Sequence, residues 1–295
     1  MGAMILKCVW FVFLVVGVLS FLIFGVREGY AAYGGKDAIF RSKVGLFDVY
    51  TLPERQSEGN VSILIGASSR DIDEYIPTGA YPTAVNAFAV KTPDGVILID
   101  TGLGQNLALN LKSVGLSPED IDSVLITHSH GDHIGGLLKD GAPAFPNAKV
   151  YISAAEFEWS HQVRRSLLGY EGRVNRFTPG GLDDSGTELM KGIRAIAAYG
   201  HTPGHTLFMI ESAEERLLVW GDLTHAITIQ APRPDISVTY DSDPLQAAAA
   251  RKEVLKFAAE TSTPIAGMHI AYPGIGKIEP DSKRAGSYKF VPSSE

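Results

Sequence analysis

The sequence predicts an α/β fold of the α+β kind, in which helices cover mixed β-sheets. Two observations support this prediction. Apolar, β-rich runs alternate irregularly with helical segments, and no internal repeat or low-complexity segment interrupts them. Hairpins are expected early in each half of the chain, so parallel and antiparallel neighbours should occur in the same sheets. Such a mixture is typical of sheets packed against helices around a core.

The size and composition are those of a globular protein with one large domain or two small ones. The chain has 295 residues, 45% hydrophobic and 20% charged. Its net charge of −7 argues against a nucleic-acid partner, which would require a basic face, and predicts no attraction to an anionic membrane surface. The one cysteine, Cys8, lies in an apolar N-terminal run, so the folded part should contain neither a disulfide nor a thiolate metal ligand.

The N-terminal apolar run covers residues 8–26 and carries no charge. As a helix it would span about 28 Å, close to the ~30 Å hydrocarbon core of a bilayer. Residues 1–27 are therefore expected to be a signal peptide or a signal-anchor transmembrane helix, with a buried core helix as the alternative. Residues 28–38 read as a linker. Under both favoured interpretations residues 39–295 form a domain outside the cytoplasm, either periplasmic or extracellular, or tethered to the membrane by this helix.

The elements of the domain follow from apolar runs bounded by turn residues. The clearest helix has Asp243 as its expected N-cap and Pro244 at its first position. The expected strands cover residues 40–52, 61–69, 123–127, 149–153, 193–199, 206–212, 216–222 and 264–268. A hairpin over residues 85–102 turns at Pro93-Asp94-Gly95. The expected helical segments cover residues 106–115, 117–122, 154–170 and 243–260.

The strongest chemical signal is "THSHGDH", residues 127–133, at the end of an expected strand. Alternate residues of an extended or tightly turned loop project to the same side, so His128 and His130 can converge on one ion. Asp132 and His133 point elsewhere and can hold a second ion. Neutral imidazole and carboxylate are the usual ligands of zinc and similar divalent ions. Four such residues within six positions predict a metal site rather than unrelated surface histidines.

The longer stretch "THSHGDHIGG" resembles the H-x-H-x-D-H signature of the metallo-β-lactamase fold. In that superfamily an αββα sandwich of two mixed sheets, flanked by helices, carries one or two metal ions at the edge between the sheets. The resemblance implies three further ligands downstream. "LLVWGD" and "IAGMH" supply Asp222 and His269, and "GHTPGH" offers both His201 and His205. Similar hydrolases use the first histidine of such a segment, which makes His201 the ligand and gives His205 a supporting role.

The resemblance implies a role for each of these residues. The first metal would be held by His128, His130 and His201, the second by Asp132, His133 and His269, and both by the bridging Asp222. The cofactors would be two divalent ions, with zinc expected first and manganese, iron and cobalt as alternatives. Asp100, in "ILIDTG", matches a position that orients ligands by hydrogen bonding, with a strand-end turn residue as the alternative.

The ligand set and the C-terminal half indicate a branch. Many true β-lactamases carry cysteine or serine where Asp222 stands, and residues 80–295 look most similar to the methyl parathion hydrolase group, which includes lactone and aryl-ester hydrolases. The resemblance implies a dinuclear metal-dependent hydrolase that cleaves a small-molecule lactone or activated aryl ester with a metal-bridging hydroxide. The alternatives are an organophosphate triester hydrolase, a β-lactamase, and a binding module on an inactive scaffold. A homodimer is compatible with the sequence.

The expected catalytic residues are Asp132, Asp222 and His225. The two aspartates would orient the hydroxide. His225 follows Asp222 by three residues, so it should lie beside the metals and could hydrogen-bond an ester carbonyl oxygen or a leaving alkoxide; an apolar residue there would favour phosphotriesters. The candidate pocket aromatics, for which ordinary core or surface packing is the alternative, are Trp159, Tyr240 and Phe157.

Overall fold

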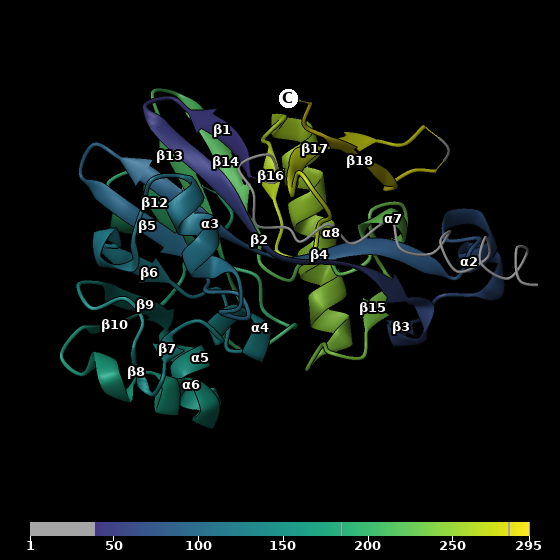
Figure 1. Cartoon of the computed structure of the whole chain (residues 1–295). Helices are drawn as coiled ribbons and strands as arrows, with labels where there is room; N and C mark the ends of the chain where they lie inside the picture. Colours follow the sequence, from purple (N-terminus) through teal and green to yellow (C-terminus); the bar gives the residue numbers. More distant parts are fainter. Residues whose placement is uncertain (1–38, 184, 283, 295) are drawn as a thin grey trace, which may run out of the picture. The chain divides into compact units, whose positions relative to one another are not determined.

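The computed structural model describes residues 39–183, 185–282 and 284–294 (Figure 1). The apolar run at residues 8–26 and the expected linker lie outside these ranges. Among the described helices, none combines the length and the apolar character that crossing a membrane would require.

The first sheet is mixed, with seven strands. From β1 to β5 neighbouring strands are antiparallel, and from β5 to β10 they are parallel. In spatial order the strands are β1 (Phe40–Val44), β2 (Phe47–Asn60), β4 (Ala80–Thr92), β5 (Gly95–Ile99), β6 (Ser123–Leu125), β9 (Lys149–Ser153) and β10 (Val174–Phe177).

The second sheet is also mixed and has seven strands. Strands β14 and β16 are parallel, and the other neighbours are antiparallel. Its strands are β11 (Thr187–Met190), β12 (Ile193–Ala197), β13 (Thr206–Ser212), β14 (Glu215–Val219), β16 (Ile265–Ala266), β17 (Ile275–Pro280) and β18 (Tyr288–Pro292). Two short pairs join β3 (Leu64–Ile65) to β15 (Ser237–Val238) and β7 (Leu138–Lys139) to β8 (Ala142–Pro143).

The helices are short except for α8, which lies alongside β17 (Figure 1). The α-helices are α2 (Ser69–Tyr75), α3 (Leu107–Ser113), α4 (Gly131–Ile134), α5 (Ala154–Trp159), α6 (His161–Ser166), α7 (Ile227–Gln230) and α8 (Pro244–Thr261). Single 3₁₀ turns cover η2 (Val61–Ile63), η3 (Pro118–Asp120) and η4 (Leu168–Tyr170).

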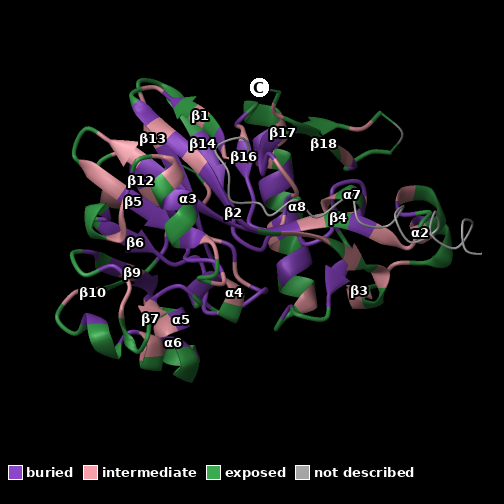
Figure 2. Ribbon diagram, in the orientation of Figure 1, coloured by how far each residue is buried: buried purple, intermediate pink, exposed green. Residues whose placement is uncertain are grey.

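Side chains alternate between the two faces of each strand, so buried residues of the sheets form one core cluster between the sheets and one on the outer face of each sheet. Figure 2 shows that much of these strands is buried. Ile97 and Ile99 of β5 face the second sheet, where they share a cluster with Phe208 of β13. Leu98, between them, joins the cluster under α3 and α6, and Met209 of β13 joins the cluster under α8. The inner faces of the two sheets therefore pack against each other, and helices cover the outer face of each sheet. The predicted αββα sandwich is confirmed.

The hairpin predicted over residues 85–102 is confirmed, with Thr92 paired to Gly95. The helix at residues 243–260 is confirmed too, since Asp243 accepts hydrogen bonds from the N–H groups of Leu245 and Gln246. The single helix predicted over residues 154–170 is wrong: extended backbone at Ser160 ends α5, and the Ser160 hydroxyl caps α6.

Two predicted strands also differ from the structure. The run at residues 40–52 is two antiparallel strands, because Gly45 adopts a left-handed turn conformation with φ of +55°. The strand predicted over residues 61–69 is wrong: residues 61–63 form the 3₁₀ turn η2, in which Asn60 accepts a hydrogen bond from the N–H of Ser62, and Ser69 begins α2. The remaining strand character there is the two-residue β3.

Candidate metal centre

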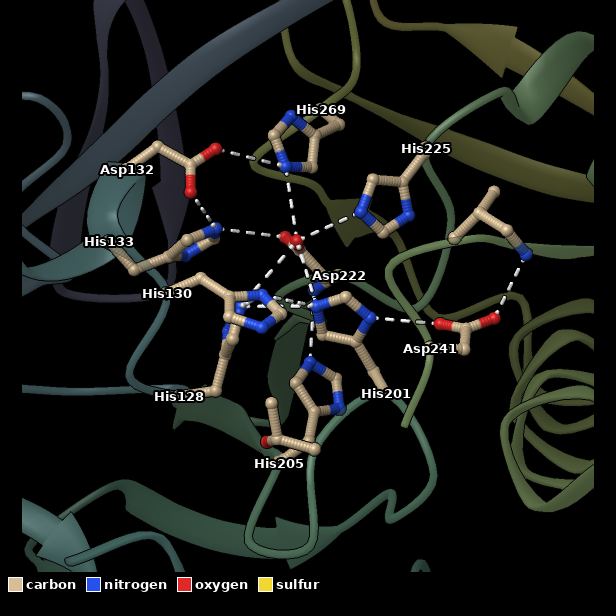
Figure 3. A network of polar contacts seen from close by, with 12 residues as sticks. His128, His130, Asp132, His133, His201, His205, Asp222, His225, Asp241 and His269 are labelled. Carbon is tan, nitrogen blue, oxygen red and sulfur yellow. Dashed lines mark hydrogen bonds and ion pairs between the residues drawn. The ribbon is translucent and has the colours of Figure 1, made fainter. Parts of the chain in front are cut away.

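The seven predicted ligands meet at the ends of strands from both sheets (Figure 3). His128 and His130 follow β6, Asp132 and His133 lie in α4, His201 lies between β12 and β13, Asp222 follows β14, and His269 follows β16. The ligand side chains span 142 positions of the chain. They meet because the strands that carry them, from both sheets, end beside one another.

The first predicted ligand set consists of three imidazoles whose ring nitrogens face one another. His201 Nε2 lies 3.2 Å from His128 Nε2 and 3.0 Å from His130 Nδ1, and the last two atoms are 3.0 Å apart. Asp222 Oδ2 lies 3.3 Å from His201 Nε2 and 3.6 Å from His128 Nε2. Three nitrogens and a carboxylate oxygen converging in this way form a donor set suited to a divalent cation.

The second predicted set shares Asp222 with the first. Its Oδ1 lies 3.1 Å from His133 Nε2, and its Oδ2 lies 3.1 Å from His269 Nε2. Asp132 completes the set, with oxygens 3.8 Å from His133 Nε2 and 3.6 Å from His269 Nε2. Asp222 is therefore the carboxylate that could bridge two ions, as the sequence predicts.

The protonation states of His128, His130 and Asp222 favour metal binding. Burial lowers the pKa of His128 well below its usual range and that of His130 to about 4, which leaves both rings neutral with free lone pairs. Burial opposes ionisation of Asp222, but His133 and the other imidazoles lower its pKa well below the usual range. Buried His133 Nε2 and Asp222 Oδ1 have no hydrogen-bond partner among the described residues. A cation between them would satisfy both atoms, so the residues present fit the implied metals.

Asp100 lies where the resemblance places a supporting residue. Its Oδ2 is 2.7 Å from His133 Nδ1, and it accepts hydrogen bonds from the backbone N–H and the hydroxyl of Thr127. The contact fixes the ring so that Nε2 faces the centre. Asp100 sits in left-handed backbone, with φ of +55°, which is uncommon outside glycine.

Asp241 plays the same part for His201 and was missed in the sequence. Its Oδ1 lies 2.9 Å from His201 Nδ1, and its Oδ2 accepts from the N–H of Val238. Buried Arg251 of α8 lies 3.7 Å from Asp241 and donates from Nε to the carbonyl of Leu223, the residue after Asp222. The only sequence signal was a short polar stretch, "YDSD", which does not reveal the contact.

His205 has both ring nitrogens occupied by the backbone. Its Nδ1 donates to the carbonyl of Ala198 at 2.9 Å, and its Nε2 accepts from the N–H of Asp222 at 2.9 Å. Burial lowers its pKa to about 3, so the ring is neutral. This geometry leaves His201, rather than His205, facing the cluster.

A pocket of about 650 Å³ opens onto the cluster. His225 lines it, stacked on His269 at 4.7 Å between ring centroids, with Nε2 3.1 Å from Asp222 Oδ2. Tyr240 also lines it, 54% exposed, with its ring 5.6 Å from that of His225. Both residues lie where the sequence predicts a substrate pocket.

The other two predicted pocket aromatics lie elsewhere. Trp159 is 46% exposed and its ring lies 6.4 Å from that of His130, but it is not among the residues that line the pocket. Phe157 packs below the first sheet, with the guanidinium of Arg176 5.1 Å from its ring. Neither Trp159 nor Phe157 lines the cavity that opens onto the cluster.

One pocket wall was missed in the sequence. It comes from the second half of β2, its turn η2 and the facing part of β4, and includes Arg55, Ser57, Asn60, Ser62, Tyr81 and Thr83. The strand expected over residues 40–52 ended before Pro53, a residue that has no N–H to donate to a neighbouring strand. In the structure a register shift between Pro53 and Arg55 accommodates the proline, and the strand continues to Asn60.

An αββα sandwich with clustered histidines and aspartates at the edge of its sheets defines a class of metal-binding proteins. The chain belongs to the metallo-beta-lactamase superfamily, whose family model matches residues 80–269. The family predicted from "THSHGDHIGG" is therefore confirmed. The ligand assignments remain predictions that the geometry supports.

Curated relatives match part of the chain by sequence, and solved structures of this fold match most of it. An N-acyl homoserine lactonase of Bacillus cereus is 26% identical over 165 residues, 45% of this chain and 60% of that protein. The chain therefore matches less than two thirds of that relative's length. Among solved structures, hydrolase AbOPH of the beta lactamase superfamily has a TM-score of 0.79 at 26% identity, covering 87% and 98% of the two chains. The dizinc quorum-quenching lactonase AidC has a TM-score of 0.79 at 25% identity, covering 90% and 99%.

Proposed function

We propose that this chain is a dinuclear metal-dependent hydrolase that opens a lactone or cleaves an activated aryl ester. The observation that carries the proposal is the convergence of seven histidine and aspartate side chains beside one pocket, which His130, Asp132, Asp222 and His269 line. Its similarity to N-acyl homoserine lactonases, one of them a dizinc enzyme, supports a lactone substrate and zinc as the metal.

Two divalent cations held by these residues would supply a hydroxide nucleophile at neutral pH and stabilise negative charge on the substrate carbonyl oxygen. Asp132, whose side chain is 29% exposed and lines the pocket, would orient the attacking water and hold its proton. Burial lowers the pKa of His225 to about 4, so its ring is neutral and can donate one N–H to the leaving alkoxide.

A phosphotriester is the second candidate substrate, because the same pocket floor would polarise a phosphoryl oxygen. The polar ring of His225 on the pocket wall favours the ester, whose leaving alkoxide needs a hydrogen bond. A β-lactam is less favoured because residue 222 is aspartate.

The test is a substrate panel on the zinc-loaded protein: acyl-homoserine lactones, dihydrocoumarin, p-nitrophenyl esters, methyl paraoxon and nitrocefin. We expect the highest kcat/KM on a lactone or aryl ester, and at most weak turnover of methyl paraoxon and nitrocefin. The Asp222→Ala variant provides the background rate, since the Asp222 carboxylate contacts histidines of both predicted ligand sets. Rates on every substrate equal to this background would rule the proposal out.

A further inference from the structure

A buried glutamate outside the ligand set connects two of the loops that carry ligands. Glu156, in the first turn of α5, is 0% exposed. Its Oε1 accepts hydrogen bonds from the N–H of Ser129 at 2.9 Å and from the Ser129 hydroxyl at 2.5 Å. Its Oε2 accepts from the Thr202 hydroxyl at 2.6 Å and from the N–H of Gly204 at 3.1 Å. One carboxylate oxygen thus binds the loop that contains Ser129, and the other binds the loop that contains Thr202 and Gly204.

The two loops both belong to the first predicted metal site. Ser129 lies between His128 and His130, and Thr202 directly follows His201. These three histidines are the three imidazoles of that site. The second site has different supports: Asp100 contacts His133, and the carbonyl of Ala84 contacts His269 Nδ1 at 2.7 Å.

The packing around Glu156 is too close to be adjusted by small movements. A Cβ atom at Gly204 would lie 2.3 Å from Glu156 N and 2.4 Å from Ser153 Oγ, so only glycine fits against this end of α5. The Ser153 hydroxyl also donates to the Gly204 carbonyl at 2.8 Å. The spacing from Ser153 to Glu156 is typical of a capping box, in which the glutamate would turn back to the helix end. Here both of its oxygens turn to the two loops instead.

We infer that Glu156 is a positioning residue that sets the distance between the His128–His130 pair and His201, and thereby the affinity of the first metal site. The inference rests on the dinuclear site of the proposed function. An ionised carboxylate accepts hydrogen bonds at both oxygens, whereas an amide presents an NH₂ group at one end. In Glu156→Gln that group must face a backbone N–H, of either Ser129 or Gly204, so one loop loses its support.

The experiment is a titration of the metal-free protein with Zn²⁺ by calorimetry, in the wild type and in Glu156→Gln. His201→Ala and His269→Ala identify the first and the second binding step. We expect Glu156→Gln to raise the Kd of the first site by about 10–100-fold, the usual effect of losing a residue that orients a ligand, and to leave the second within about twofold. Glu158→Gln is the matched control: Glu158 lies in the same helix, its side chain is 69% exposed, and both Kd values should stay unchanged.

If Glu156→Gln fails to fold, Ser129→Ala and Thr202→Val each remove one hydroxyl donor and keep the backbone hydrogen bonds. Both should weaken the first site by a smaller factor in the same direction. Wild-type affinity at the first site in the folded variants, or equal weakening of both sites, would overturn the inference. The titration uses no substrate, so it tests the role of Glu156 separately from the proposed function. A protein that binds two zinc ions but hydrolyses nothing would contradict the proposed function and leave the inference about Glu156 standing.

Discussion

At the scale of single residues, the ring nitrogens separate histidines that look equivalent in "GHTPGH". His201 has one nitrogen fixed by Asp241 and the other facing the cluster, whereas both nitrogens of His205 contact the backbone. An imidazole can ligate only through a nitrogen that has a free lone pair. His201 can therefore ligate a metal ion, whereas His205 supports the backbone around the site.

The first prediction compares these two histidines. His201→Ala should reduce bound zinc from two ions towards one and lower kcat/KM by more than about 100-fold, beyond the usual effect of losing a supporting residue. His205→Ala should keep both ions but lose about 1–3 kcal/mol of stability, because the N–H of Asp222 is left buried without an acceptor. Metal analysis and chemical denaturation measure both effects. Equal loss of metal in the two variants would show that the assignment is reversed.

The second prediction concerns Asp241, whose carboxylate accepts from His201 and Val238. In Asp241→Asn the amide NH₂ must face one of these donors, so the His201 ring loses its orientation. We expect zinc to bind the first site about 10–100-fold more weakly. Asp243→Asn is the control, since the Asp243 side chain caps α8 by accepting hydrogen bonds from the N–H groups of Leu245 and Gln246. Unchanged zinc affinity in Asp241→Asn would contradict this role.

The third prediction concerns His225, which stacks on His269 in the pocket wall. His225→Leu removes the N–H proposed for the leaving alkoxide and leaves all seven predicted ligands in place. We expect kcat/KM on lactones and aryl esters to fall by about 10²–10⁴-fold, the usual contribution of a positioned proton donor. Turnover of methyl paraoxon should fall less or rise. Steady-state kinetics with metal analysis would test this, and a parallel loss on all substrates would speak against a donor role.

The sequence predicted the residues of the cluster far better than the residues around it. His128 to His133 form a local pattern, and His201, Asp222 and His269 follow strands at the spacing of a known family. Asp241 and Glu156 give no such signal, because their contacts with the ligand loops join segments 27 to 48 residues apart. A buried carboxylate in a helix or loop looks like a surface residue until the tertiary structure supplies its donors.

At the scale of elements, Glu211 connects three neighbouring strands of the second sheet. From β13 it pairs with Arg194 of β12 at 2.7 Å and with Arg216 of β14 at 2.8 Å. The hydrogen bond from Arg194 is the main reason that the pKa of Glu211 is lowered from its usual value of 4.5. The carboxylate is therefore more stable in the folded chain than in the unfolded chain.

The fourth prediction follows from the sign of this shift. A lowered folded pKa means that the unfolded chain takes up the proton first as the pH falls. The contribution of Glu211 should be fully present above about pH 4.5 and be lost as the pH falls through the lowered folded value. For a partly exposed pair we expect at most about 1 kcal/mol. Urea denaturation of wild type and Glu211→Gln should differ at pH 7 and converge in acid; a constant difference would contradict the prediction.

Element boundaries were predictable where one local signal dominates. The hairpin at residues 85–102 and helix α8 have strong turn and cap residues, and both agree with the structure. The sequence did not reveal the break at Ser160, because the flanking segments both favour helix and the break consists of extended backbone at this one residue, whose hydroxyl caps the start of α6. The length of β2 was missed because a register shift, which no local pattern announces, allows the strand to pass Pro53.

At the scale of the whole described domain, the predicted metal site joins the two sheets. The ligands that follow β6 or lie in α4 belong to the half of the domain built on the first sheet. The ligand in the loop before β13 and the ligands that follow β14 and β16 belong to the half built on the second sheet. Asp222 contacts imidazoles from both halves. Cations bound there would stabilise the folded state only, since the ligands are far apart in the unfolded chain.

The last prediction is that removing metal lowers the stability of both halves together. An ion present at 1,000 times its Kd adds about 4 kcal/mol of stability, and for a domain of this size each kcal/mol shifts the Tm by about 2–4 °C. Calorimetry of the zinc-loaded protein should therefore show one transition that moves down by roughly 8–16 °C for each ion removed by chelation and returns when zinc is restored. In Asp222→Ala, which loses a ligand of both sites, chelation should shift the Tm much less. If the wild-type Tm were the same with and without chelator, the cluster would not hold metal in the folded protein, because tight binding to the folded state alone must raise its stability.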